Sequence, residues 1–130
     1  MTSPDSFRAR RIAAVSILQQ GQVLVASIPT ALDDAQLAEL QRNLMHRITE
    51  CGTRSVIIDV AALDVVDSFA AKVLGACATM ARLRGAELTV VGIQPDVALS
   101  MVEIGLGIGA AHTALDLEDG MDDAGGPPRR

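Results

Sequence analysis

Short apolar runs alternate with longer segments of helical periodicity along this chain, and this alternation constrains the fold more than any other feature. The run Val56 to Val60 is apolar except at Asp59, and a second run follows at Leu88 to Val91. Runs with so little polar alternation are typical of strands covered on both faces, as in parallel sheets. Strands that alternate with helices require right-handed crossovers. The sequence therefore predicts an α/β fold with a mainly parallel sheet.

A first helix is expected after Pro29. Two overlapping pairs have the spacing of a capping box at its start, namely Thr30 with Asp33 and Asp33 with Gln36. Gly52 supplies a left-handed stop. Apolar residues recur between these signals at steps of three and four, which places them on one helix face: Leu37, Leu40, Leu44, Ile48 and Cys51.

Three further helices and three further strands complete the predicted order, β-β-α-β-α-β-α-β-α. Helices are expected at Phe69 to Leu83, which is rich in small residues, and from Pro95, a residue that favours the first turn. A polar segment with a glycine predicts an antiparallel hairpin. It separates the two strands of the hairpin, which are expected at Ile12 to Leu18 and Val23 to Ser27. Near the end of the chain we expect a strand at Ala111 to Leu115 and a short helix at Leu117 to Asp122.

A chain of 130 residues is near the commonest size of one domain. We expect that domain over residues 12–120. The polar residues 1–11 are expected to form a flexible N-terminal arm, and residues 121–130 a disordered tail.

Charge and aromatic content exclude several classes of function. The chain has 11 Lys and Arg against 16 Asp and Glu, and two Phe but no Trp or Tyr. We expect no nucleic-acid partner, because such binding needs basic and aromatic side chains. Apolar runs stay short of the ~20 residues that span a bilayer, and the first residues lack the order of a secretory signal. Cys51 and Cys77 are expected to be small buried apolar residues, as free cysteines are in a reducing compartment. We therefore expect a cytoplasmic protein without a membrane partner.

No group in the sequence points to catalysis. Gly105, Gly107 and Gly109 follow a predicted helix, whereas a phosphate-binding glycine loop follows a strand, so we interpret them as a helix exit. His46 and His112 have no partner at metal-ligand spacing. No nucleophile and base can be paired. We expect neither an enzyme nor a cofactor.

Three acidic residues, Asp59, Asp64 and Asp67, cluster where a strand ends and a helix begins. Ligands of open α/β sheets usually bind at this edge, and three carboxylates can hold Mg²⁺ if their oxygens converge. The simpler interpretation, which we favour, is that Asp67 caps the helix and the other two are loop acids.

Ser68 follows Asp67 at the start of the predicted helix and admits two interpretations. From position alone we expect a helix cap, because a serine oxygen there accepts an otherwise unpaired backbone N–H. Phosphorylation is the functional alternative, since helix N-termini favour phosphate groups. A phosphate would add about two negative charges beside Asp67.

Several segments together resemble the STAS domain family, which includes bacterial anti-anti-sigma factors and the proteins of the stressosome. Within that family the chain is most similar to the RsbS branch, and the resemblance implies a mixed sheet with helices. It extends over nearly all of Ile12 to Gly120. The segments that carry it are Val56 to Val60, Asp64 to Phe69, Met80 to Leu83, Val91 to Pro95 and Thr113 to Gly120.

The resemblance also implies a non-enzymatic scaffold that is switched at Ser68. An RsbT-type serine kinase would phosphorylate Ser68. The unphosphorylated chain would assemble with RsbR-type STAS paralogues, as a homo-oligomer or a large hetero-oligomeric assembly, and hold the kinase captive. Phosphorylation would then release the kinase. Asp67, Phe69 and Asp64 are the expected supporting residues of the partner site.

One departure from the family pattern favours the RsbS branch. Typical anti-anti-sigma factors have a second Ser or Thr and then Gly at this place, whereas here Ser68 is followed by Phe69. A stand-alone anti-anti-sigma factor that binds an anti-sigma kinase, or a STAS subunit of a lipid-transport complex, stays an alternative. Second phosphorylation sites at Thr89, Ser100 or Thr113 also stay open.

Overall fold

The computed structural model describes residues 15–103, 105, 107, 109, 111–114 and 120. The expected arm and tail, the predicted strand residues 12–14 and 115, and the predicted helix apart from Gly120 lie outside this part of the chain. Eight elements are described: β1 (Ser16–Gln20), β2 (Val23–Ser27), α2 (Asp34–Cys51), β3 (Ser55–Asp59), α3 (Ser68–Leu83), β4 (Glu87–Val91), α4 (Pro95–Glu103) and β5 (His112–Ala114). Their order is the predicted one as far as β5.

The strands form one five-stranded sheet in the order β1-β2-β3-β4-β5. The predicted hairpin is present, because β1 and β2 pair antiparallel and Gly21 turns the chain between them with a φ of 62°. The other neighbouring strands pair in parallel. The mixed, mainly parallel sheet of the expected α/β fold is therefore confirmed.

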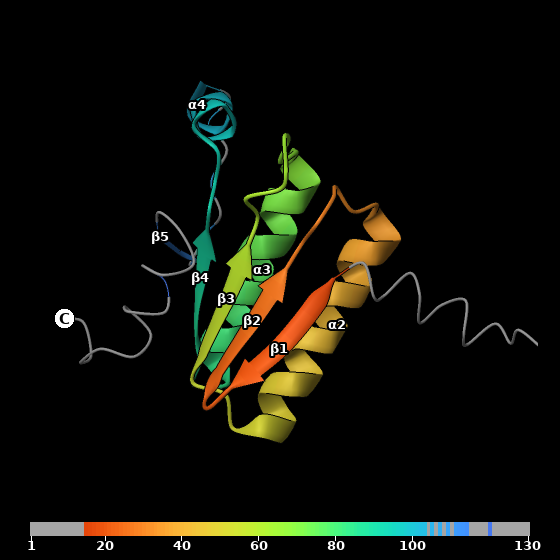
Figure 1. Cartoon of the computed structure of the whole chain (residues 1–130), viewed down its shortest axis with the longest axis vertical. Helices are drawn as coiled ribbons and strands as arrows, with labels where there is room; N and C mark the ends of the chain where they lie inside the picture. The colour runs from red at the N-terminus through yellow and green to blue at the C-terminus, as the bar shows by residue number, and fades with distance from the viewer. Residues whose placement is uncertain are drawn as a thin grey trace, which may run out of the picture.

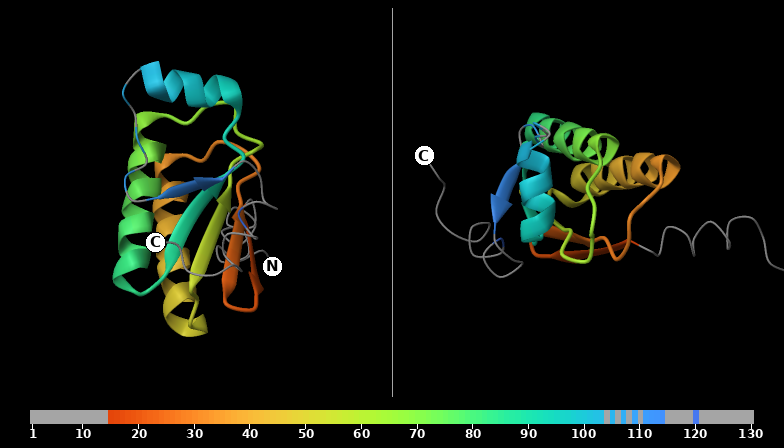
Figure 2. Two further views of the ribbon diagram at one scale, coloured as in Figure 1. Left: turned by 90° about the vertical axis from the view of Figure 1, so that its left-hand side faces the viewer. Right: turned by 90° about the horizontal axis from the view of Figure 1, so that it is seen from above.

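Helices α2 and α3 lie side by side on one face of the sheet (Figures 1 and 2). The main core fills the layer between these helices and the sheet. Strand residues alternate between the two faces of the sheet, so every second one points toward the helices. Small residues of α3 pack within this layer. Its strand residues are Leu24, Ala26, Val56, Ile58, Leu88 and Val90, and its helix residues include Leu40, Leu44, Ile48, Ala71, Cys77, Ala78 and Ala81.

The opposite face of the sheet carries a second, smaller apolar cluster of Val25, Ile57 and Val91. Gly120 packs against it so closely that a Cβ there would lie 2.7 Å from Cγ1 of Val91. Ile57 has no exposed surface. Strand β3 is thus buried on both faces, as its apolar run predicts.

A capping box fixes the start of α2. The Gln36 N–H donates to Oδ1 of Asp33 at 2.7 Å, and the Asp33 N–H donates to Oε1 of Gln36 at 2.9 Å. Thr30 lies in the preceding loop, so the earlier of the two predicted starts is wrong. Gly52, with a φ of 59°, follows the last helical residue as expected.

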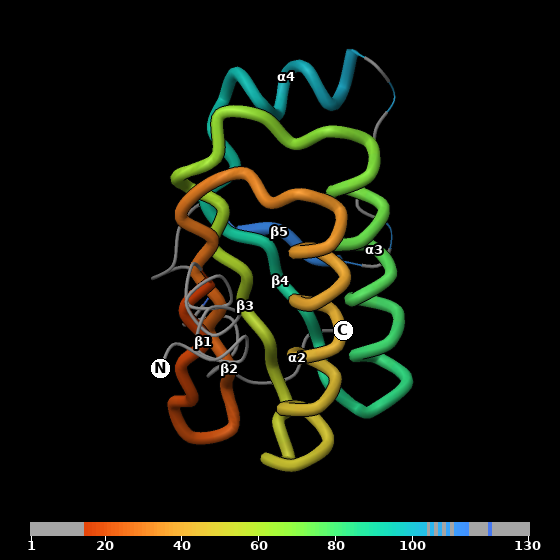
Figure 3. Tube along the Cα trace, turned by 90° about the vertical axis from the view of Figure 1, so that its right-hand side faces the viewer, coloured from red at the N-terminus to blue at the C-terminus, as the bar shows by residue number. Residues whose placement is uncertain are grey.

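The loops after β2 and β3, the start of α3 and helix α4 gather at one end of the sheet (Figures 1 and 3). Chain direction explains this, because β2, β3 and β4 are parallel and end there. Gly105, with a φ of 68°, follows α4, and Gly109 lies close to Gly75 of α3. The glycine segment is the predicted helix exit.

Among the described residues, no helix is both long and apolar enough to cross a bilayer.

Candidate functional site

The loop of residues 60–67 carries the chain from β3 to α3 at the carboxyl end of the parallel strands. Leu63 and Val66 point inward and are 7% and 8% exposed. Asp64 is exposed, and so is Val65 between the two buried residues. Burial of Leu63 and Val66 therefore anchors the loop and fixes where α3 begins.

Three contacts at Ala61 hold the first part of this loop. The Ala61 N–H donates to Oδ1 of Asp59 at 2.9 Å, and Nε2 of Gln94 donates to the Ala61 carbonyl at 2.8 Å. Gly92 approaches Ala61 so closely that a Cβ at Gly92 would lie 2.8 Å from Cβ of Ala61. The loop after β4 thus supports the loop that leads to Ser68.

Asp67, rather than Ser68, is the N-cap of α3. The Ala70 N–H donates to Oδ1 of Asp67 at 2.7 Å, and Asp67 has extended backbone geometry. Ser68 is the first helical residue, so the expectation that it caps the helix is wrong. A preceding aspartate already accepts the N–H that a serine cap would take. Within the part of the chain that the structure describes, the exposed Ser68 side chain has no hydrogen-bond partner.

Two exposed apolar side chains flank Ser68. Val65 is 65% exposed and Phe69 is 40% exposed. Such a pair next to a free hydroxyl is a surface that a protein partner can cover, since burial of apolar area drives association. Asp64, Asp67 and Phe69 are exposed, as Ser68 is, and their role in partner binding stays a prediction.

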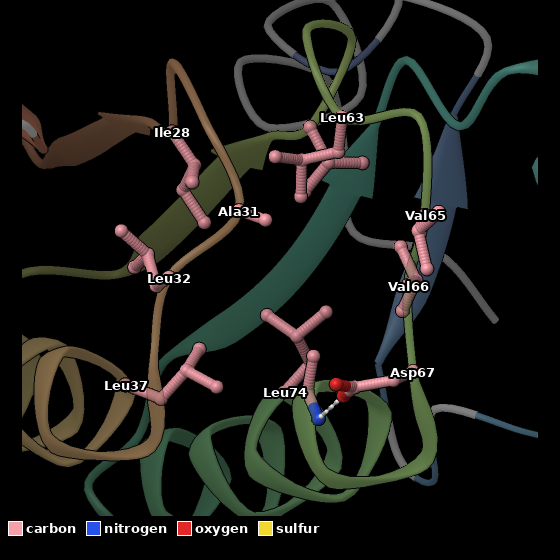
Figure 4. A pocket seen from close by; sticks show the side chains of 11 residues that line it. Ile28, Ala31, Leu32, Leu37, Leu63, Val65, Val66, Asp67 and Leu74 are labelled. Carbon is pink, nitrogen blue, oxygen red and sulfur yellow. Dashed lines mark hydrogen bonds between the residues drawn. The ribbon is translucent and has the colours of Figure 1, made fainter.

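An apolar pocket adjoins this surface between the loops after β2 and β3 (Figure 4). Asp67 alone, among the residues that line it, has a polar side chain, and its Oδ1 atom is taken by Ala70. Sequence reasoning missed the contribution of the loop after β2, although Ile28 and Leu32 are apolar residues outside the predicted helix stripe. The lining residues are Ile28, Ala31, Leu32, Leu37, Val60, Leu63, Val65, Val66, Asp67, Ala70 and Leu74.

The acidic residues do not form a metal centre in the described part of the chain. No group of three His, Cys, Asp or Glu side chains there is arranged to hold a metal ion. Asp59 and Asp67 each accept a backbone N–H. The favoured interpretation, in which Asp67 caps the helix, is confirmed for that residue.

The histidines pair with glutamates, and Cys77 lies in the core. His46 pairs with Glu50 along α2, with Nε2 3.0 Å from Oε1, and His112 pairs with Glu87 across β4 and β5. Cys77 is buried in the main core, and burial raises the pKa of its thiol to about 11. A thiol with such a pKa is a poor nucleophile at neutral pH.

The fold and the sequence of this site match a known family. The sequence profile of the STAS domain family matches residues 14–119. The chain belongs to the STAS domain family. This finding confirms the resemblance inferred from the segments around Asp67.

Two solved STAS structures are similar along almost their whole length. RsbS of Moorella thermoacetica, in a serine-to-glutamate variant, is 34% identical with a TM-score of 0.73, and the match covers 85% of this chain and 93% of that one. A chain in a structure of the stressosome, which is described as a signal integration and transduction hub, is 31% identical with a TM-score of 0.67. That match covers 84% of this chain and 95% of the other.

A curated relative is longer than this chain. The RsbT co-antagonist protein RsbRA of Bacillus subtilis (strain 168) is 24% identical over 102 residues. The match covers 78% of this chain but only 37% of RsbRA. Together, these similarities support a regulatory role for this STAS domain.

Proposed function

We propose that this chain is a non-enzymatic scaffold of a stressosome-type assembly. In its unphosphorylated form it binds and sequesters an RsbT-type serine kinase, and phosphorylation of Ser68 releases that kinase. The observation that carries the proposal is the exposed hydroxyl of Ser68, which is free of the capping bond and flanked by Val65 and Phe69.

The solved relatives support the choice of partners. Similarity to RsbS and to a chain of the stressosome supports assembly with other STAS proteins, and RsbRA is named as a co-antagonist of RsbT. We infer that RsbR-type paralogues share the assembly with this chain, and that the kinase binds at the Ser68 surface.

The chemistry of the switch needs only one free hydroxyl on this chain. The Ser68 oxygen attacks the γ-phosphorus of ATP held by the kinase, the new O–P bond replaces the bond to ADP, and the hydroxyl proton passes to a base of the kinase. Because Asp67 holds the start of α3, Ser68 presents its side chain to the partner without breaking a helix cap.

Release follows from the cost of burying charge. Phe69 and Val65 pack against the bound kinase in the proposed complex, so a phosphate on Ser68 would have to lose its water at an apolar interface. Asp64 and Asp67 add like charge nearby. A loss of a few kcal/mol lowers affinity by about a hundredfold or more.

Intact-mass spectrometry with an RsbT-type kinase and ATP tests the proposal. We expect one added phosphate on the wild type and none on Ser68→Ala. The same variant should keep the kinase bound, and Ser68→Asp should release it partly because one carboxylate carries less charge than a phosphate. Equal binding of the kinase by Ser68→Asp and Ser68→Ala would contradict the release mechanism. Absence of phosphate on the wild type would contradict the switch.

The state of assembly separates this function from the alternatives within the family. Mixed with an RsbR-type protein, the chain should elute as a large hetero-oligomer on size-exclusion chromatography with light scattering. A small complex with an anti-sigma kinase would favour the stand-alone anti-anti-sigma factor. Co-purification with a transporter ATPase would favour the lipid-transport subunit.

A further inference from the structure

The only lysine of the chain lies four residues after Ser68 on the same helix. Ten of the 11 basic residues are arginines, and Lys72 is the eleventh. Lys72 is exposed, and within the described residues its ammonium group makes no ion pair or hydrogen bond. Side chains four residues apart on a helix are neighbours on its surface, so the Lys72 side chain can reach the Ser68 side chain.

Helix α3 offers Lys72 no anionic partner of its own. The sequence of α3 holds no Asp or Glu, although acidic residues outnumber basic ones in the chain by 16 to 11. The helix positions three and four residues from Lys72 are Ser68, Phe69, Gly75 and Ala76. The carboxylate of Asp67, just before the helix, is engaged by the Ala70 N–H. A lysine in this setting lacks the carboxylate that usually neutralises it.

We propose that Lys72 is the counter-ion of phosphorylated Ser68. This inference rests on the proposed phosphorylation and says what holds the phosphate once it is attached. A phosphoserine carries about −1.5 to −2 charges near neutral pH. An anion that precedes a lysine by four residues has the favourable orientation for a helical ion pair. Asp64 and Asp67 oppose the phosphate by like charge, and the positive charge of Lys72 offsets this repulsion.

The pair decides where the phosphate lies. Bound to Lys72, it is drawn along the first turn of α3, over the surface that includes Phe69. The charge then covers the apolar group proposed to contact the kinase. Lys72 is therefore a positioning residue for the phosphorylated state and has no part in the transfer step.

The test uses the full chain with phosphoserine incorporated at position 68 during translation, so that no kinase is needed. Titration by ³¹P NMR gives the second pKa of the phosphate, which is about 6 without neighbours. We expect Lys72→Gln to raise this pKa by about 0.3 unit, because the free energy of a helical ion pair at this spacing corresponds to a pKa change of about that size. Lys72→Arg should keep the wild-type value. Salt at ~1 M should remove the difference.

A matched control removes a cation that already has a partner. Arg42 on α2 forms an ion pair with Glu39, with Nη2 2.5 Å from Oε2, so Arg42→Gln should leave the phosphate pKa unchanged. The inference is overturned if Lys72→Gln leaves the pKa unchanged, or if Arg42→Gln moves it equally.

The two proposals fail in different measurements. If the kinase leaves wild-type Ser68 unmodified while the titration shows the shift, the proposed function fails and the ion pair stands. If the kinase adds phosphate but the titration shows no shift, phosphorylation stands and the role of Lys72 is wrong.

Discussion

The carboxylate of Asp67 accepts the backbone N–H of Ala70 at 2.7 Å, so the residue before Ser68 holds the first turn of α3. This bond assigns the helix cap to Asp67, whereas the sequence alone does not decide between Asp67 and Ser68. Asp67 caps the helix start, and the exposed Ser68 hydroxyl makes no hydrogen bond within the described residues. We therefore expect that the stability of the fold and the chemistry of the proposed switch can be changed independently.

Replacement of each residue by alanine should show this division. Asp67→Ala should lower the free energy of unfolding by about 1 kcal/mol, the usual loss for an N-cap. Ser68→Ala should change it by less than about 0.5 kcal/mol, because an exposed residue without a bonded side chain is lost. Urea unfolding followed by circular dichroism measures both. A larger loss for Ser68→Ala than for Asp67→Ala would assign the cap to Ser68 after all.

Phe69 is expected to carry binding energy for the kinase. Phe69→Ala should weaken kinase binding about tenfold or more, as loss of an aromatic anchor does, and lower stability by about 1 kcal/mol because the ring is partly buried. Isothermal titration calorimetry measures the affinity. Leu83→Ala is the matched control, since Leu83 is an 80% exposed apolar residue at the far end of α3 and should leave affinity within about twofold. Equal losses in both variants would remove Phe69 from the interface.

The strand runs and the helix stripes were predictable because burial sets both patterns. Val56 to Ile58 show the continuous run of a strand covered on both faces, and Leu37 to Ile48 show one helix face. Local spacing alone could not choose between Thr30 and Asp33 as the start of α2. The capping bonds depend on where the loop after β2 places the chain, and that is decided by the whole fold.

The candidate site was predictable as a position but not as a surface. Asp67 and Ser68 can be identified at the strand-to-helix junction, yet both are residues that cap helices. The hydrogen bond from the Ala70 N–H and the extended backbone of Asp67 assign the cap to Asp67. The pocket joins Ile28 and Leu32 to Leu63, and these segments are distant in sequence. Lys72 can be identified from the sequence as the single lysine, but its lack of an anionic partner among the described residues is visible only in the structure.

Gly92 should be essential for the support of the Ser68 loop. Gly92→Ala meets two penalties, a φ of 80° and a Cβ position 2.8 Å from Cβ of Ala61. Gly21→Ala meets only the first, because its φ is 62° and nothing lies within 4 Å. We expect a loss of about 1–2 kcal/mol for Gly21→Ala from the left-handed conformation, and a clearly larger loss for Gly92→Ala.

The double variant Ala61→Gly with Gly92→Ala relieves part of the steric penalty, because it removes the Cβ 2.8 Å from the new methyl group but leaves the Cα and N of residue 61 at 3.1 Å. It should unfold at a higher denaturant concentration than Gly92→Ala, after subtraction of the effect of Ala61→Gly alone. No recovery in the double variant would show that the Cβ of Ala61 is not what opposes a side chain at position 92.

The buried thiol of Cys77 should make stability fall at high pH. Burial raises its pKa from 9.0 to about 11, so the unfolded chain loses this proton before the folded chain does. The stabilisation is complete below pH 9 and is lost as the pH rises through about 11, an effect on the order of 2 kcal/mol. Unfolding in urea at intervals from pH 8 to pH 11 measures the slope. Cys77→Ala lowers stability at all pH values by leaving a cavity, but its slope over this range should be shallower than that of the wild type. Equal slopes in the two proteins would show that Cys77 does not titrate differently in the folded and unfolded chains.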